Sequence, residues 1–234
     1  MHGNGERGNG KEDLDFVLFH GPIYEAWVQK RDLPFIIIAP QLDMMGKDKE
    51  KDYLRDRDRT KIPFRLEKGT PERLASGKPD LRMEVNLSDE DLEYNVLDKG
   101  WEERIDDVIM ILKGVLEKYN GDSNRVYLTG LSYGGFGTWY IASQFPELFA
   151  AVAPIAGWGH SDFMKSIAEQ KLPVWTFAGG RDIVIEKEYF FQGMNKLEEF
   201  GHDEVRFTIH EDMGHDVWKR VYAGSDLYDW FLEH

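Results

Sequence analysis

Cysteine is absent from this chain of 234 residues, and its absence excludes several kinds of site. The chain can form no disulfide bond, no thiolate metal site and no cysteine nucleophile. Long hydrophobic runs are also missing, because no apolar stretch approaches the roughly 20 residues of a membrane-spanning helix. No apolar stretch stands near the first residue, so the chain as given shows no secretory signal. A cytoplasmic protein without a membrane span is therefore expected for the chain as given.

Basic residues are scarce, with 29 lysines and arginines against 43 acidic residues and a net charge of −14. Nucleic acids and anionic membranes are bound through basic patches, so neither is an expected partner. Apolar residues make up 41% and charged residues 31% of the chain, as in a folded globular protein. A chain of this length can bury a full core, and one domain over residues 1–234 is the default expectation.

Short apolar runs alternate with helical patterns, which predicts an α/β fold with a mostly parallel sheet flanked by helices. Trp101, Ile105 and Ile109 begin an apolar stripe at helical spacing, and a similar stripe runs from Phe190 to Phe200. Ser225 is the expected N-cap of a closing helix. Strands are expected at residues 35–39, 126–129, 150–155, 174–178 and 205–209.

Residues 46–99 interrupt this alternation with dense charge of both signs, as in "GKDKEKDYLRDRDRTK". One interpretation is a solvated, partly mobile excursion. Apolar residues recur within it, however, and long insertions in compact domains are often functional. We therefore predict an insertion that partly folds, either near the mouth of the site or against a neighbouring subunit of a homo-oligomer.

The segment Gly130-Leu131-Ser132-Tyr133-Gly134 lies between a predicted strand and a predicted helix. A sharp strand-to-helix turn pushes a serine hydroxyl out of the sheet, and the flanking glycines allow the backbone to crowd it. The same turn aims the backbone N–H of Tyr133 at an oxygen that becomes negatively charged during reaction. Ser132 is therefore the candidate nucleophile, and Tyr133 a candidate oxyanion donor.

A serine nucleophile needs a base and an acid that orients the base. Asp182 follows the strand expected at residues 174–178, and His215 follows the strand expected at 205–209. The order Ser, Asp, His along the chain is that of α/β-hydrolases. His210-Glu211 offers a rival zinc motif, but the next histidine is five residues on, so the two would not share a helical face. No metal and no cofactor are therefore expected.

The segments "HGNGERG", "FIIIAPQ", "RVYLTGLSYGGFGTW", "FPELFAAVAPIAGW", "FAGGRDIVI" and "GHDVWKRVYAGSDLYDWF" resemble the esterase group of the α/β-hydrolase superfamily. The resemblance is to members of the polyhydroxybutyrate-depolymerase-like and feruloyl or acetyl-xylan-esterase-like kinds, including some labelled predicted peptidases. It covers most of the chain outside residues 46–99 and implies an α/β-hydrolase fold. It also implies that the N–H of Asn4 is the second oxyanion donor. In that role the Asn4 side chain should matter little, and Glu6 and Arg7 are expected to hold the loop by pairing within it.

The strand that precedes this loop in the family is absent before His2, so the fold is expected to lack its first N-terminal strands. Three alternatives stay open. Residues 35–39 and 126–129 could pair directly, or "LRMEVNL" at residues 81–87 could fill the gap. The native start could also lie upstream of Met1, which would leave room for a signal peptide.

Together these residues predict a serine carboxylesterase that hydrolyses small soluble esters with short acyl, aryl or sugar groups. Gln41, Trp158 and His160 follow predicted strands and are expected to line the mouth of the site. No long apolar lid sequence is evident, which favours small soluble esters over triglycerides. Two alternatives are a serine peptidase of the same fold and a non-catalytic binding protein on a hydrolase scaffold.

Overall fold

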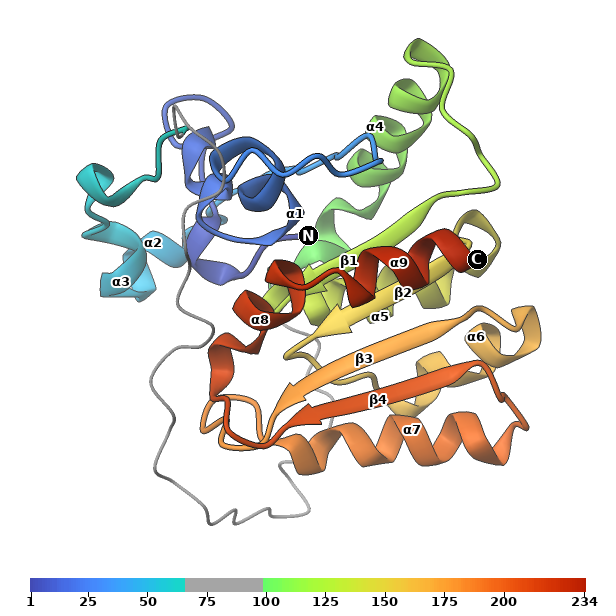
Figure 1. Cartoon of the computed structure of the whole chain (residues 1–234). Helices are drawn as coiled ribbons and strands as arrows, with labels where there is room; N and C mark the ends of the chain where they lie inside the picture. Colours follow the sequence, from blue (N-terminus) through green and yellow to red (C-terminus); the bar gives the residue numbers. More distant parts are fainter. Residues whose placement is uncertain (66–98) are drawn as a thin grey trace.

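The computed structural model describes residues 1–65 and 99–234, and its centre is a parallel sheet (Figure 1). The strands are β1 (Tyr127–Leu131), β2 (Ala151–Ile155), β3 (Val174–Gly179) and β4 (Val205–His210). They pair in the order β1-β2-β3-β4, and every pairing is parallel. Helices connect consecutive strands, as parallel pairing requires. The predicted α/β fold with a parallel sheet flanked by helices is confirmed.

The helices expected from the stripes at residues 101–119 and 190–200, and the closing helix after Ser225, are present as α4, α7 and α9. The stripe that begins at Trp101 forms a short 3₁₀ turn, Trp101–Arg104, and continues as α4. Ser225 precedes α9 as expected, but its backbone is already helical (φ −99°, ψ −25°) and its side chain makes no capping hydrogen bond. The principal helices are α4 (Ile105–Lys118), α5 (Tyr133–Gln144), α6 (Met164–Gln170), α7 (Phe190–Glu199), α8 (Trp218–Ala223) and α9 (Asp226–Glu233), with the shorter α1 (Gly21–Ile23), α2 (Lys47–Glu50) and α3 (Asp52–Arg55) before them.

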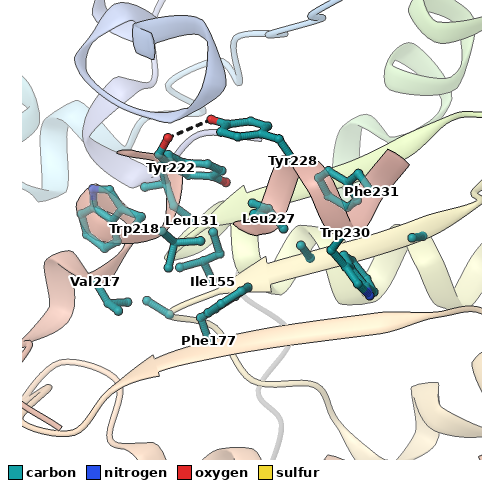
Figure 2. Close-up of a cluster of buried hydrophobic side chains, with 14 of the residues drawn as sticks. Leu131, Ile155, Phe177, Val217, Trp218, Tyr222, Leu227, Tyr228, Trp230 and Phe231 are labelled. Atoms are coloured by element: carbon teal, nitrogen blue, oxygen red, sulfur yellow. Dashed lines mark hydrogen bonds between the residues drawn. The ribbon is translucent and has the colours of Figure 1, made fainter. Parts of the chain in front are cut away.

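Two apolar layers cover the two faces of the sheet, because successive side chains of a strand point to opposite faces. On one face Ile155 and Phe177 pack against α8 and α9 (Figure 2). On the other face Val152 and Val174 pack against α4, α5, α6 and α7. Figure 2 also shows the Tyr228 hydroxyl donating a hydrogen bond to the Tyr222 carbonyl, at 3.0 Å, which joins α9 to α8.

The expected strand at residues 35–39 is wrong, because this run pairs with no strand in the described part of the chain. It lies beside β1 through side chains, as when the Phe35 ring packs edge-on against Tyr127 at 5.8 Å. Between this run and β1 is an apolar cavity of about 440 Å³, lined by residues such as Ile36 and Leu128. Direct pairing of the two runs is thus ruled out, and the alternative at residues 81–87 lies outside the described residues.

Met1 occupies the outer edge of β1 at the end nearest Ser132. Its amino group donates to the Thr129 carbonyl, and the Leu131 N–H donates to the Met1 carbonyl at 3.1 Å. The first residues of the chain therefore begin beside the strand that leads into the candidate nucleophile. Across the described ranges, none of the helices is both long and apolar enough to span a lipid bilayer.

Candidate active site

Ser132 lies in the turn between β1 and α5 with a backbone conformation that side chains rarely adopt (φ 50°, ψ −115°). Such strain persists only where the surroundings enforce it. A Cβ on Gly130 would lie 2.3 Å from the Gly134 carbonyl oxygen, and one on Gly134 would lie 2.4 Å from the Met1 oxygen. Both glycines are therefore required for the close approach of the strand, the turn and residues 1–8, which we call the first loop.

Ser132, His215 and Asp182 form a continuous hydrogen-bonded chain. Ser132 Oγ lies 2.9 Å from His215 Nε2, and His215 Nδ1 lies 2.7 Å from Asp182 Oδ2. A carboxylate can only accept, so the proton of the neutral imidazole lies on Nδ1 and Nε2 presents a lone pair to the serine hydroxyl. This arrangement can remove a proton from Ser132 when the serine attacks an electrophile.

The three side chains meet because they follow the carboxyl ends of parallel strands β1, β3 and β4. Asp182 is held most firmly, since its Oδ1 accepts the backbone N–H groups of Val184 at 2.8 Å and Ile185 at 2.9 Å. The Asp182 side chain is 1% exposed, so a buried carboxylate orients the His215 ring. The structure thus brings together the three residues that the sequence singled out for nucleophile, base and orienting acid.

His2 sets the direction of the first loop. The Leu42 N–H donates to His2 Nε2 at 2.9 Å, so Nδ1 carries the proton and donates to the Gly3 carbonyl at 2.6 Å. The carbonyl and N–H of one trans peptide unit point in opposite directions. Fixing the Gly3 carbonyl therefore also fixes the direction of the Asn4 N–H. Burial lowers the pKa of His2 to about 3, so the ring stays neutral in this role.

The Asn4 side chain has partners that the sequence did not indicate. Its Oδ1 accepts from Arg7 Nε at 2.5 Å, and its Nδ2 donates to the Tyr53 hydroxyl. Arg57 adds a hydrogen bond from Nη1 to the Gly5 carbonyl at 3.3 Å. The structure thus gives the Asn4 side chain a place in holding the loop, and its effect on turnover stays a prediction. The described part of the insertion contributes Tyr53 and Arg57 to that loop.

Glu6 lies buried beside this loop, with Oε1 4.0 Å from His20 Nε2. Burial raises the pKa of the Glu6 carboxyl to about 7, although the backbone amides of Gly3 and Glu6 and the charge of Arg57 oppose the rise. Burial likewise lowers the pKa of His20 to about 4. The expected pairing within the loop is realised by Arg7 with Asn4, whereas Glu6 faces His20.

The residues expected at the mouth of the site lie in different settings. Gln41 Nε2 donates to the Glu6 carbonyl at 3.0 Å, and its Oε1 accepts the Gly10 N–H at 2.9 Å. Trp158 is 8% exposed and stacks on Tyr189 at 5.8 Å. The His160 ring lies 6.5 Å from the Trp158 ring. Gln41 thus holds the first loop, while Trp158 and His160 belong to an aromatic cluster; their contact with a substrate stays a prediction.

The rival zinc motif has other contacts in the structure. Glu211 pairs with Lys187 at 2.9 Å, and His210 Nδ1 lies 3.5 Å from Arg220 Nη1. Within residues 1–65 and 99–234, no three His, Asp or Glu side chains converge so as to hold a metal ion.

Arg7, Tyr53 and Arg57 are the site residues that the sequence reasoning missed or placed only in part. The signal for Arg7 was its position three residues after Asn4, in the motif "HGNGERG". Tyr53 and Arg57 carried no usable signal, because they lie in a charged stretch whose composition indicates a solvated loop.

Comparison with known proteins matches residues 94–197 to the prolyl oligopeptidase family. A feruloyl esterase B from Talaromyces stipitatus is 33% identical over 79 residues, which are 34% of this chain and 22% of that protein. A bifunctional acetylxylan esterase/xylanase from Neocallimastix patriciarum is 28% identical over 123 residues, 53% of this chain and 17% of that protein. The chain thus spans less than a quarter of the length of these two relatives.

Among solved structures, a thermostable esterase matches with 36% sequence identity and a TM-score of 0.52. The match covers 56% of this chain and 36% of the esterase chain. Esterases therefore recur among the relatives found by sequence and by structure. With its parallel sheet, its strand-to-helix serine turn and these matches, the chain has an α/β-hydrolase fold and is similar over part of its length to esterases.

Proposed function

We propose that this protein is a serine carboxylesterase that cleaves small soluble esters through a covalent acyl-enzyme. The observation that carries the proposal is the unbroken chain of hydrogen bonds from Ser132 through His215 to Asp182. In this proposal Ser132 is the nucleophile, His215 the general base and acid, and Asp182 the residue that orients the imidazole.

In the acylation step, Ser132 Oγ bonds to the ester carbonyl carbon while its proton passes to His215 Nε2. The carbonyl double bond opens, and its electron pair moves to the oxygen, which becomes negatively charged. Asp182 stabilises the imidazolium through the hydrogen bond to Nδ1. When the tetrahedral intermediate collapses, the bond to the alcohol oxygen breaks, and His215 protonates the leaving alcohol.

The oxyanion donors in this proposal are the backbone N–H groups of Tyr133 and Asn4. Tyr133 begins α5, and the first N–H groups of a helix point out of its N-terminal end. The Asn4 N–H is directed by the His2 contact with the preceding carbonyl. Donors that are fixed before reaction stabilise a developing charge without reorganisation. In deacylation a water molecule gives a proton to His215 and attacks the acyl carbon. The bond from that carbon to Ser132 Oγ then breaks, His215 returns the proton to Oγ, and the acid is released.

The proposed substrate class follows from the surroundings of the site and from the names of the relatives. Trp158 follows β2, Phe136 lies in α5 and Tyr189 directly precedes α7, and their rings form an aromatic cluster that favours flat or apolar acyl groups. By their names, these relatives act on feruloyl esters and on acetylated xylan. We therefore favour short-chain or aryl acyl groups on small alcohols or sugars.

A panel of substrates tests the proposal. The purified chain should hydrolyse p-nitrophenyl acetate and acylated sugars and should leave peptide p-nitroanilides intact. Cleavage of the anilides without hydrolysis of the esters would instead indicate a serine peptidase. The match to the prolyl oligopeptidase family supports that alternative. Binding of an ester without turnover of any substrate would indicate a non-catalytic binding protein. Activity should not change with chelators, because the proposed mechanism uses no metal.

A further inference from the structure

Arg7 is a completely buried guanidinium at the centre of the first loop, with 0% of its surface exposed. Its Nε donates to Asn4 Oδ1 at 2.5 Å. Its Nη1 donates to the Asp43 carbonyl at 2.8 Å, and its Nη2 donates to the Lys99 carbonyl at 2.5 Å. Three segments that are distant in sequence therefore meet on the edge of one planar group.

The same guanidinium lies over the Tyr133 ring, with Arg7 Cζ 4.9 Å from the ring centroid. Tyr133 directly follows Ser132 and begins α5. Arg7 thus contacts both Asn4 and Tyr133. These are the two residues whose backbone N–H groups are the proposed oxyanion donors.

The chemistry of these contacts suits an arginine and no other side chain. Guanidinium offers five donors in a rigid fork and stacks on aromatic rings, whereas a lysine ammonium is a compact charge on a flexible stem. Each of the hydrogen bonds above goes to a neutral oxygen, because the Asp43 carboxylate pairs instead with Arg104 at 2.9 Å. Burial lowers the pKa of Arg7, and Tyr133 is the first of the groups that oppose this change. Burying a charge is costly, and the three hydrogen bonds of the Arg7 guanidinium offset part of that cost.

We infer that Arg7 is a positioning residue that sets the spacing between the Asn4 and Tyr133 N–H groups, and thereby shapes the oxyanion hole. The inference rests on the proposed serine-esterase function and adds a residue that contacts neither substrate nor triad. A displacement of about 1 Å in a reacting group can lower turnover by roughly 100-fold, so such a residue should act mainly on kcat.

The test compares Arg7→Lys with a matched control, Arg31→Lys. Arg31 also donates to three backbone carbonyls, those of Tyr222, Ala223 and Gly224, and its Cζ lies 5.2 Å from the Tyr228 ring centroid. Both arginines thus donate to backbone carbonyls and lie over a tyrosine ring, although Arg31 also pairs with Glu25 at 3.6 Å. Only Arg7 joins the proposed oxyanion donors. For each variant the measurements are kcat and KM for p-nitrophenyl acetate, the inhibition constant of an aryl trifluoromethyl ketone, and the urea unfolding curve.

The ketone reports directly on the oxyanion hole, because attack by Ser132 converts it into a hemiketal with a negatively charged oxygen. Arg7→Lys should lower kcat by roughly 10- to 100-fold with little change in KM, and should weaken the ketone by a similar factor. Arg31→Lys should leave both quantities unchanged, even if it lowers the unfolding midpoint. The inference would be overturned if the wild type is active and Arg7→Lys has the same kcat and ketone inhibition constant. Equal losses of kcat in Arg7→Lys and Arg31→Lys would also overturn it.

A second variant keeps the test decisive if Arg7→Lys does not fold. Asn4→Ala removes the oxygen that Arg7 holds and keeps the backbone N–H, so it should lower kcat by about 10-fold and weaken the ketone in proportion. Wild-type turnover in Asn4→Ala would contradict the inference. Lack of turnover in the wild type itself would instead overturn the proposed function, and the inference with it.

Discussion

Glu6 links the stability of the first loop to pH, because burial raises its pKa from 4.5 to about 7. In the unfolded chain the carboxyl ionises near its ordinary pKa. Between these two pH values the folded protein holds a proton that the unfolded chain releases, so stability falls as pH rises. The contribution is fully present below pH 4.5 and is lost as pH rises through about 7; it amounts to at most about 3 kcal/mol.

Glu6→Gln should therefore raise the free energy of unfolding at pH 8 relative to the wild type and change it little at pH 4.5. Urea unfolding at the two pH values measures this difference. Glu198, which is exposed, provides the control substitution Glu198→Gln, for which no such pH dependence is expected. If Glu6→Gln and Glu198→Gln follow the wild type equally at both pH values, folding does not raise the pKa of Glu6 and the account of this residue is wrong.

The sequence predicted some residues of the site and missed the contacts of others, for a physical reason. Ser132, Asp182 and His215 each follow a strand, so their local context carried the information. The proposed role of Arg7 depends on the carbonyl oxygens of Asp43 and Lys99 and on the Tyr133 ring. These groups lie near Arg7 only in the folded chain. No local pattern encodes such a meeting point.

At the scale of elements, the start of α5 packs against the first loop more closely than any side chain would permit. A Cβ on Gly134 would lie 2.4 Å from the Met1 carbonyl oxygen and 2.7 Å from that of His2. Both neighbours are backbone atoms that cannot rotate away. Gly134 thus couples the position of α5 to the position of the proposed oxyanion loop.

Gly134→Ala should destabilise the fold by roughly 1–3 kcal/mol, as overpacking of a tight contact does, and should also reduce turnover. Gly114 in α4 is the control, because a Cβ there meets no atom within 4 Å. Gly114→Ala should stabilise the protein by about 0.5–1 kcal/mol through helix propensity. Urea unfolding of both variants measures the contrast. Equal stability of Gly134→Ala and the wild type would mean that helix and loop are not tightly coupled.

Strands were predicted correctly where an apolar run also pairs with a neighbouring strand, and wrongly where it does not. The strands near residues 126, 150, 174 and 205 were expected and are confirmed as β1 to β4. The run at residues 35–39 is apolar enough for a buried strand, yet none of its residues is buried in the structure and Ile36 is 58% exposed. Beside β1 the run packs through side chains and leaves an apolar cavity of about 440 Å³.

At the scale of the whole molecule, the net charge of −14 produces a negative field around the protein. A cationic ester should be attracted to the protein and an anionic ester repelled, and salt screens both effects. With matched acetate esters of equal reactivity, added NaCl should therefore lower kcat/KM for the cationic ester and raise it for the anionic one. The same salt dependence for both esters would show that the field does not reach the site.

The central claim is that Ser132 performs covalent catalysis on esters, and the most direct measurement is the initial rate of p-nitrophenyl acetate hydrolysis by the wild type and by Ser132→Ala. The wild type should turn over the ester, and Ser132→Ala should lose at least about 10³-fold in kcat while keeping its circular dichroism spectrum and unfolding midpoint. A well-folded Ser132→Ala that hydrolyses the ester as fast as the wild type would contradict the assignment of the nucleophile and the mechanism built on it.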